Sequence, residues 1–172
     1  MSAAREFDVV IAGAGLPGLA LAAALARSGL SVALVEQDDI GGGTTAWSSR
    51  LIHGGLRYVE HGEVGLVRES LRERELLLRN APHLGPPLQF PLPIYARLGH
   101  SPLTIRAGLL AYDLLSPRMS TPRHRMLTAA EALHVEPGLG PHGLRGAALY
   151  WDAQANYPER IALENALDAR AH

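Results

Sequence analysis

The chain has 172 residues, a formal net charge of −1 and no cysteine, and each of its 16 basic residues is an arginine. This length allows one ordinary domain, and the near-zero charge provides no long-range field for nucleic acid. The composition excludes disulfides, thiol catalysis, zinc–thiolate sites and every mechanism that needs a lysine, such as a Schiff base or a P-loop.

Residues 13–18 (GAGLPG) read G-x-G-x-x-G and lie between a segment typical of a strand and a segment typical of a helix. Residues 7–12 are short, β-branched and nearly all apolar, as in a strand buried on both faces. From Leu16 onward, apolar residues recur at helical spacing until Ser28 and Gly29 end the run. In this context the glycine motif predicts a dinucleotide-binding site.

Each glycine of the motif has a physical reason. Gly13 allows a sharp exit from the strand, Gly15 removes a Cβ that would block a pyrophosphate, and Gly18 lets the helix pack closely. The positive end of the helix then faces the phosphates. The next strand, residues 31–36, ends in Glu36, which would accept hydrogen bonds from ribose hydroxyls and repel a 2′-phosphate, so NADP is disfavoured.

Residues 38–49 form a loop rich in glycine and hydroxyl side chains. One interpretation is a flexible surface connection, and the other is a strip of small donors along a cofactor. Because the loop follows the ribose-binding acid directly, the second interpretation is favoured.

A helix is expected at residues 63–79, with Val67, Leu71 and Leu78 on one face and its many charges on a solvated face. The proline-rich residues 81–93 cannot continue a helix and should link to a second structural unit. The remaining expected elements are an edge strand within 88–95, a helix at 104–115, a capping-box helix opened by Thr128 and Glu131, a strand at 146–151, and a last helix from Pro158 anchored by Ile161, Leu163 and Leu167.

A crossover helix in a parallel sheet is normally followed by the strand that it delivers, but the last helix is followed only by His172. We therefore expect a chain truncated in mid-fold. The apolar N-terminal segment is too often interrupted to reach the roughly 20 residues of a membrane span, so we interpret it as strand plus helix of a cytoplasmic protein. The histidines show no metal-binding spacing, and no metal site is expected.

Residues 51–60 (LIHGGLRYVE) are the most distinctive stretch. Gly54 and Gly55 would bring the backbone close to a flat ligand, while His53 and Arg57 would flank it with donors. An equally acceptable interpretation is a turn with a satisfied histidine and a surface arginine.

Residues 48–60 (SSRLIHGGLRYVE) closely resemble the signature of FAD-dependent glycerol-3-phosphate dehydrogenases, members of the D-amino-acid-oxidase-like superfamily. Trp47 departs from this pattern, since a small residue is usual there, and residues 156–160 replace a more acidic run. The resemblance continues through residues 66–69 (LVRE), Leu71, 73–74 (ER), 77–84 (LLRNAPHL), 108–109 (GL), 112–113 (YD), 150–154 (YWDAQ) and 163–166 (LENA).

The resemblance implies an α/β fold with a Rossmann-like FAD-binding domain, here residues 1–85 and 152–172, interleaved with the start of a substrate domain at 86–151. It implies oxidation of sn-glycerol 3-phosphate to dihydroxyacetone phosphate by hydride transfer from C2 to flavin N5. Electrons would pass to a quinone or to oxygen, with peripheral association at the inner face of the cell membrane.

By position, the resemblance makes Arg57 a substrate-binding residue, with Tyr58 beside it. No catalytic base is assigned; His53 qualifies by its chemistry alone, and a contact to the cofactor is favoured for it. The family's other phosphate-binding residues and its C-terminal flavin-contacting segment would lie beyond residue 172. The expected FAD contacts are Gly13, Gly15, Leu16, Gly18, Glu36, Thr45, Ser48, Ser49, Leu51 and His53.

Two alternatives stay open. The first is a related flavin-dependent oxidase that acts on an amine or another hydroxy compound. The second is a non-catalytic, truncated FAD-binding fragment.

Overall fold

The computed structural model describes residues 5–97, 99–116 and 119–172. The chain divides into two compact units, which we call the terminal unit (Met1–Arg50 and Ala155–His172) and the inserted unit (Leu51–Gln154). The sequence predicted domain boundaries after residue 85 and before residue 152, whereas the two units meet after Arg50 and before Ala155. The difference arises because the helices between residues 56 and 80 pack within the inserted unit.

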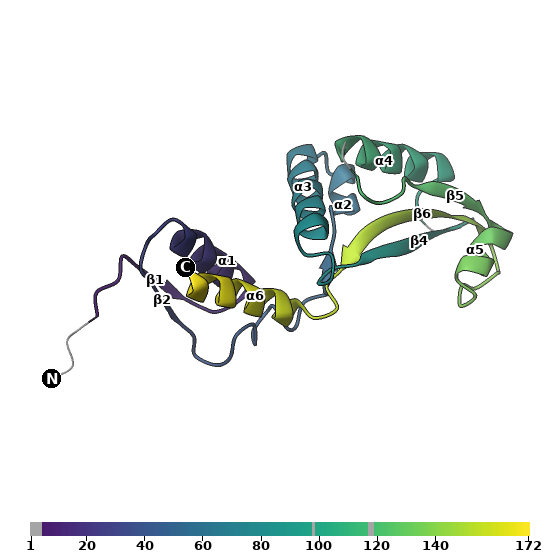
Figure 1. The fold of residues 1–172 in the computed structure, drawn as a ribbon. Coiled ribbons are helices and arrows are strands. Elements are labelled where there is room, and N and C mark those ends of the chain that lie inside the picture. The colour runs from purple at the N-terminus through teal and green to yellow at the C-terminus, as the bar shows by residue number, and fades with distance from the viewer. Residues whose placement is uncertain (1–4, 98, 117–118) are drawn as a thin grey trace. The chain divides into compact units, whose positions relative to one another are not determined.

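The terminal unit contains the predicted strand, helix and strand in order (Figure 1). Strand β1 (Val9–Ala12) pairs in parallel with β2 (Val32–Val35), and helix α1 (Leu16–Arg27) connects them. Helix α6 (Pro158–Ala171) packs beside α1. The parallel βαβ arrangement expected from the glycine motif is therefore confirmed.

Small side chains form the contact between α1 and α6. Ala14, Leu19 and Ala162 are buried together in one cluster. The prediction that Leu163 and Leu167 anchor α6 is wrong, because their exposed fractions are 37% and 47%. Ile161, the third predicted anchor, is buried, and so is Ala162. Of the clustered residues, Ala14 belongs to the glycine turn, Leu19 to α1 and Ala162 to α6, so α6 buries the stripe that contains Ala162 and leaves its two leucines more exposed.

Strand β1 was expected to be buried on both faces, and this is also wrong within the described residues. Ile11 is buried, but Val10, whose side chain leaves the opposite face of the strand, is 66% exposed. One face of the β1–β2 pair is thus covered in the part of the chain that the structure describes.

The inserted unit is built on strand β6 (Leu144–Gln154), which is paired antiparallel with all of its neighbours. Helices α2 (Leu56–Glu60), α3 (Val64–Asn80) and α4 (Pro102–Leu115) pack on one face of this sheet (Figure 1). Val67 and Leu71 of α3 form a core with Tyr112 of α4, and the partly buried Leu56 and Val59 of α2 pack against it. The other elements are β3 (Leu51–Ile52), β4 (Pro87–Tyr95), β5 (Arg125–Thr128) and α5 (Ala129–Val135).

Strand β4 is an edge strand, as predicted, and among the described residues it pairs only with β6. Pro87, Pro91 and Pro93 occupy positions of the same parity, so their missing N–H groups all fall on one side of the strand. Proline is tolerated on the solvent side of an edge strand, where no ladder hydrogen bond is lost.

Helix α3 confirms the buried positions Val67, Leu71 and Leu78 and corrects the expectation of a solvated charged face. Arg74 is completely buried and Glu75 nearly so. Arg74 follows Val67 by seven residues and Leu71 by three, so it lies on the apolar stripe itself.

The capping box of α5 is formed as predicted. Thr128 Oγ1 accepts the backbone N–H of Glu131, whose carboxylate accepts the N–H of Thr128. Within residues 5–97, 99–116 and 119–172, no helix combines the length and the apolar character that a membrane crossing requires.

Candidate functional site

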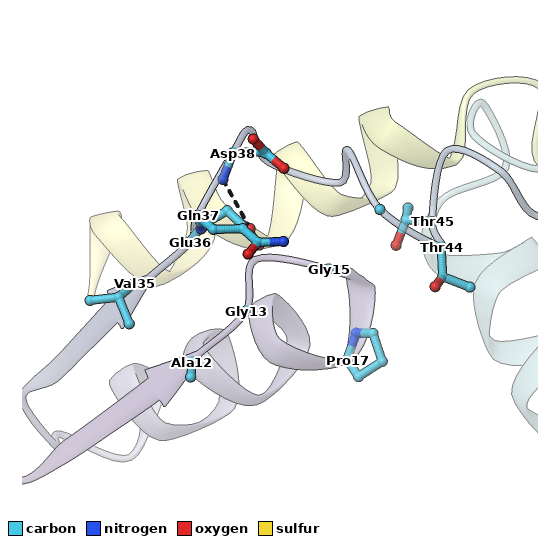
Figure 2. Close-up of a pocket in the computed structure, with 11 residues that line it drawn as sticks. Ala12, Gly13, Gly15, Pro17, Val35, Glu36, Gln37, Asp38, Thr44 and Thr45 are labelled. Atoms are coloured by element: carbon cyan, nitrogen blue, oxygen red, sulfur yellow. Dashed lines mark hydrogen bonds between the residues drawn. The ribbon is translucent and has the colours of Figure 1, made fainter.

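A cavity of about 880 Å³ lies at the glycine turn of the terminal unit (Figure 2). It opens at the carboxyl ends of β1 and β2, where open α/β sheets bind their ligands. Its volume is within the range of roughly 300–1,000 Å³ that is usual for ligand pockets. The lining residues are Ala12, Gly13, Gly15, Pro17, Val35, Glu36, Gln37, Asp38, Gly43, Thr44 and Thr45.

The three glycines of the motif have different structural roles. Gly13 has a φ of +107°, which favours glycine, and its N–H donates to the Val35 carbonyl at 2.8 Å. A Cβ on Gly18 would collide with the Gly13 carbonyl oxygen, so α1 begins directly against the end of β1. A Cβ on Gly15 would meet nothing closer than Thr45 Oγ1, at 3.6 Å. Gly15 thus leaves open space at the helix N-terminus.

Glu36 is bonded to the turn through its carboxylate. Oε2 accepts the N–H of Ala14 at 2.6 Å. Oε1 accepts the N–H groups of Gln37 at 2.7 Å and of Asp38 at 3.2 Å, and Figure 2 shows the bond from Asp38. These hydrogen bonds, with that from Ala14 the strongest influence, lower the pKa of Glu36. A carboxylate has about four acceptor positions, so an ionised Glu36 can still accept from a ligand hydroxyl.

Thr45 lies at the start of α1, and its Oγ1 accepts the N–H of Leu16 at 3.1 Å. None of the described residues accepts the N–H of Gly15. That donor and the positive end of the helix dipole lie beside the cavity. The turn therefore has the donor set and the open space that a pyrophosphate requires.

The predicted contacts of the terminal unit are only partly brought together. Gly13, Gly15, Glu36 and Thr45 line the cavity, whereas Leu16, Gly18, Ser48 and Ser49 do not. The Ser48 hydroxyl donates to the Thr45 carbonyl and accepts the N–H of Arg50, so it shapes the loop locally. Sequence reasoning did not select Gln37, Asp38 and Thr44, although Gln37 adjoins Glu36, Thr44 adjoins Thr45, and Asp38 begins the loop that was expected to follow the cofactor.

A second cavity, of about 290 Å³, lies within the inserted unit. It gathers four of the residues predicted from the sequence, namely Leu51, His53, Arg57 and Tyr58, together with Gly55, Leu56, Phe90, Tyr150 and Asp152. That Leu51 and His53 contact the same cofactor as Gly13 stays a prediction.

His53 is oriented by the backbone of the next turn. Its Nδ1 accepts the N–H of Gly55 at 3.0 Å. A neutral imidazole with Nδ1 as acceptor carries its proton on Nε2, so the ring offers the cavity a donor. In this geometry the Nδ1 lone pair is engaged by the Gly55 N–H, and Nε2 is the ring nitrogen that donates.

The two glycines that follow His53 are required by packing against the protein. A Cβ on Gly54 would collide with Leu71 and with the Tyr112 hydroxyl. Gly55 has a φ of +69°, and a Cβ there would collide with the Tyr58 ring. Both glycines are buried, so the structure gives them a role that does not depend on a flat ligand.

One wall of the second cavity is aromatic and acidic. Tyr150 stacks on Phe90 with ring centroids 5.5 Å apart. Burial, and secondarily the charge of Asp152, raise the pKa of Tyr150 to about 12. The sequence contained a signal for this wall, because Asp152 interrupts an otherwise mostly apolar strand.

A parallel βαβ unit with a glycine turn, a helix N-terminus at a cavity and an acid closing the second strand defines a dinucleotide-binding α/β protein. Residues 8–172 match the family described as FAD dependent oxidoreductase, and the chain belongs to that family.

Several relatives carry the name glycerol-3-phosphate dehydrogenase. The Synechocystis sp. protein is 45% identical over 164 residues, which cover 95% of this chain and 30% of the relative. The Mycobacterium leprae protein is 47% identical over 149 residues, which cover 86% of this chain and 25% of the relative. The chain thus spans between a quarter and a third of the length of these relatives.

Solved structures of dehydrogenases are also similar to this chain. The glycerol-3-phosphate dehydrogenase from Bacillus halodurans, solved in complex with FAD, has a TM-score of 0.68 and 26% identity; the match covers 97% of this chain and 25% of that one. The L-proline dehydrogenase from P. horikoshii has a TM-score of 0.70 at 18% identity, covering 97% of this chain and 42% of that one, and shows a shared fold.

Proposed function

We propose that the protein binds FAD and oxidises sn-glycerol 3-phosphate to dihydroxyacetone phosphate. The observation that carries this proposal is the glycine-turn cavity closed by Glu36, in a chain that is 45% identical over 95% of its length to a glycerol-3-phosphate dehydrogenase. The cavity has room at Gly15 and an acceptor at Glu36, so its residues fit a dinucleotide with an unphosphorylated ribose.

The residues of the terminal unit would hold the cofactor. The N–H of Gly15 and the N-terminal end of α1 bind the pyrophosphate, and Glu36 accepts the ribose hydroxyls. Bound FAD would supply the two-electron acceptor that the oxidation of a secondary alcohol requires.

The residues of the inserted unit would hold the substrate. The Arg57 guanidinium pairs with the phosphate group, because its planar fork matches phosphate oxygens. Tyr58 lies beside it in the same cavity, and His53 donates through Nε2. Oxidation of the alcohol also requires a base that removes the proton of the substrate hydroxyl, and we assign this role to none of these residues.

The electron acceptor that we propose is a quinone or oxygen. With a quinone, the protein would work in the cytoplasm at the inner face of the cell membrane. Oxygen uptake and reduction of a short-chain quinone, measured in parallel with glycerol 3-phosphate, distinguish the two acceptors, and sedimentation with vesicles tests the membrane association.

The central test uses protein purified after expression from its complete coding sequence. It should be yellow, contain about one FAD per chain and reduce a redox dye with glycerol 3-phosphate. Glycerol at the same concentration is the control, since it lacks the group that Arg57 binds. A colourless product, or a flavoprotein that oxidises amino acids and leaves glycerol 3-phosphate unchanged, would contradict the proposal.

A further inference from the structure

Three side chains from distant parts of the sequence meet at the second cavity, and one of them, Asp152, lines it. Arg74 of α3, Tyr112 of α4 and Asp152 of β6 are all buried. Arg74 Nη1 donates to Asp152 Oδ1 at 2.6 Å, and the Tyr112 hydroxyl donates to the same oxygen at 2.8 Å. None of the three is among the cofactor or substrate residues selected from the sequence.

The cluster also accepts a hydrogen bond from the backbone N–H of Gly54. The N–H of Gly54 donates to the Tyr112 hydroxyl oxygen at 2.9 Å and, more weakly, to Asp152 Oδ1 at 3.3 Å. Tyr112 therefore accepts from the turn and donates to the carboxylate, which leaves its hydroxyl a single orientation. Burial and the nearby charge of Asp152 raise the pKa of Tyr112, so the hydroxyl remains protonated and able to donate.

The positive end of the cluster is also fixed. Arg74 Nη1 donates to the Trp151 carbonyl at 3.1 Å, and Nη2 donates to Glu75 at 3.1 Å. Glu75 in turn accepts the N–H of Ser120 at 2.8 Å. The guanidinium is thus held by two carboxylates and a carbonyl, and it holds Asp152 in place.

The bonded glycine lies between the residues that face the cavity. Gly54 directly follows His53, and the N–H of Gly55 donates to the His53 ring. The carbonyl of Gly55 accepts the N–H of Tyr58 at 2.8 Å, which begins the short helix that carries Arg57. A rotation of the peptide at Gly54 would therefore change the directions of both His53 and Arg57.

Stability alone is a poor explanation for such a cluster. A buried ion pair is often no more stabilising than apolar side chains of similar volume, because both charges must be desolvated. Here the apolar neighbours Val67 and Leu71 already form the core, and the polar groups converge on one backbone N–H at a cavity.

We propose that Tyr112, Asp152 and Arg74 are positioning residues that fix the turn at Gly54 and Gly55, and so direct His53 and Arg57 toward the ligand of this cavity. Fixing the turn follows from the geometry, and the identity of the ligand as glycerol 3-phosphate rests on the proposed function. Arg74 and Tyr112 do not line the cavity and act only through the turn, whereas Asp152 lines the cavity and also accepts from the Gly54 N–H.

Tyr112→Phe tests the network, and Tyr95→Phe is its matched control. Both changes delete one phenolic hydroxyl; that of Tyr95 donates to the Gly140 carbonyl at 3.0 Å, in another part of the inserted unit. Tyr112→Phe loses two buried hydrogen bonds, from the Gly54 N–H and to Asp152. Their loss is expected to speed exchange of the Gly54 amide and to lower kcat/KM for glycerol 3-phosphate, each about tenfold. Most of the second effect should lie in KM, with the FAD content unchanged.

Tyr95→Phe should leave both quantities within about twofold of the unaltered protein, because its hydrogen bond is solvent-exposed. If Tyr112→Phe matches Tyr95→Phe in amide exchange and in kcat/KM, the network does not position the turn and the proposal is overturned.

Amide exchange also decides when a variant does not fold or when the protein is inactive. If Tyr112→Phe does not fold, exchange in the unaltered protein decides: Gly54 should be a protected amide, and exchange at the rate of an open loop would overturn the proposal. If the unaltered protein does not oxidise glycerol 3-phosphate, the proposed function fails, and the exchange comparison still settles whether Tyr112 fixes the turn.

Discussion

Glu36 Oε2 accepts the backbone N–H of Ala14 at 2.6 Å, so the acid at the end of β2 is bonded to the glycine turn that follows β1. A single carboxylate thereby shapes the turn and lines the cavity beside it.

Replacing Glu36 with Gln should weaken FAD binding about tenfold or more, because a charged carboxylate is a stronger acceptor for the ribose hydroxyls than a neutral amide. Calorimetric titration of the flavin-free protein measures this. Asp39→Asn is the control, since Asp39 is also an exposed acid of this loop but does not line the cavity. Equal affinities for the two variants would contradict the assignment.

The contribution of Glu36 to the stability of the folded protein should also depend on pH. Its pKa is lowered from the ordinary value of 4.5 by the three backbone N–H groups, so the folded protein favours the ionised form. The stabilisation is complete above 4.5 and is lost as the pH falls through the lowered pKa. Acid unfolding curves of the unaltered protein and Glu36→Gln should therefore converge at low pH.

Gly18→Ala should destabilise the terminal unit by about 1–3 kcal/mol, because the new methyl group collides with the Gly13 carbonyl oxygen. Gly65→Ala is the matched control in α3, where a Cβ meets nothing within 4 Å and should stabilise the helix by about 0.5–1 kcal/mol. Urea unfolding and bound flavin measure both variants. Equal stability of the two would show that α1 does not start as closely against β1 as described.

Arg57→Ala should raise KM for glycerol 3-phosphate about ten- to hundredfold, since a charge-assisted contact to phosphate contributes roughly 1.5–3 kcal/mol. The FAD content should not change. Arg145→Ala removes an exposed arginine of β6 that does not line the second cavity, and it should leave KM unaltered. A KM increase of the same size in both variants would point to general charge and not to a phosphate site.

Arg74→Met should destabilise the inserted unit by about 3–5 kcal/mol, because it leaves Asp152 as a buried charge without its cation. Combining it with Asp152→Asn should recover part of that loss, since the unpaired charge is then removed. Arg72→Met, on the exposed side of α3, should change stability by less than about 0.5 kcal/mol. Urea unfolding in a Trp47→Phe background, followed by the fluorescence of Trp151, measures all three.

The sequence predicted the elements whose signals are local. The strand, glycine turn and helix at residues 9–27 are specified by neighbouring residues, as is the capping box of Thr128 and Glu131. The edge position of β4 also followed from its prolines. Such features depend on backbone chemistry within a few residues, so they can be predicted without knowledge of the tertiary structure.

The sequence could not predict the partners of buried side chains. Arg74 and Asp152 are 78 positions apart, and nothing in the spacing of either residue identifies the other. The helical period of α6 was visible, but the period alone does not say which stripe is buried. Its leucines were chosen, whereas the contact with α1 is made by alanines such as Ala162.

For the candidate site, the sequence predicted which residues are polar and close together but not how they are hydrogen-bonded. His53 and Arg57 stood out as polar residues beside a glycine pair, and they do line one cavity. The hydrogen bond from Gly55 that orients the His53 ring, and thereby makes it a donor, is a property of the folded turn. Nothing in the order of residues 53–55 specifies that bond.

The chain enters and leaves the inserted unit through neighbouring residues. Leu51 pairs with Gln154 across an antiparallel ladder, and the N–H of Ala155 donates to the Arg50 carbonyl at 2.8 Å. The two ends of residues 51–154 are therefore about 5 Å apart, the usual distance between paired antiparallel strands. Domains with adjacent ends are readily inserted into, or removed from, a host fold. Residues 51–154 therefore meet the structural condition for gain or loss as one unit, with the host βαβ unit unbroken.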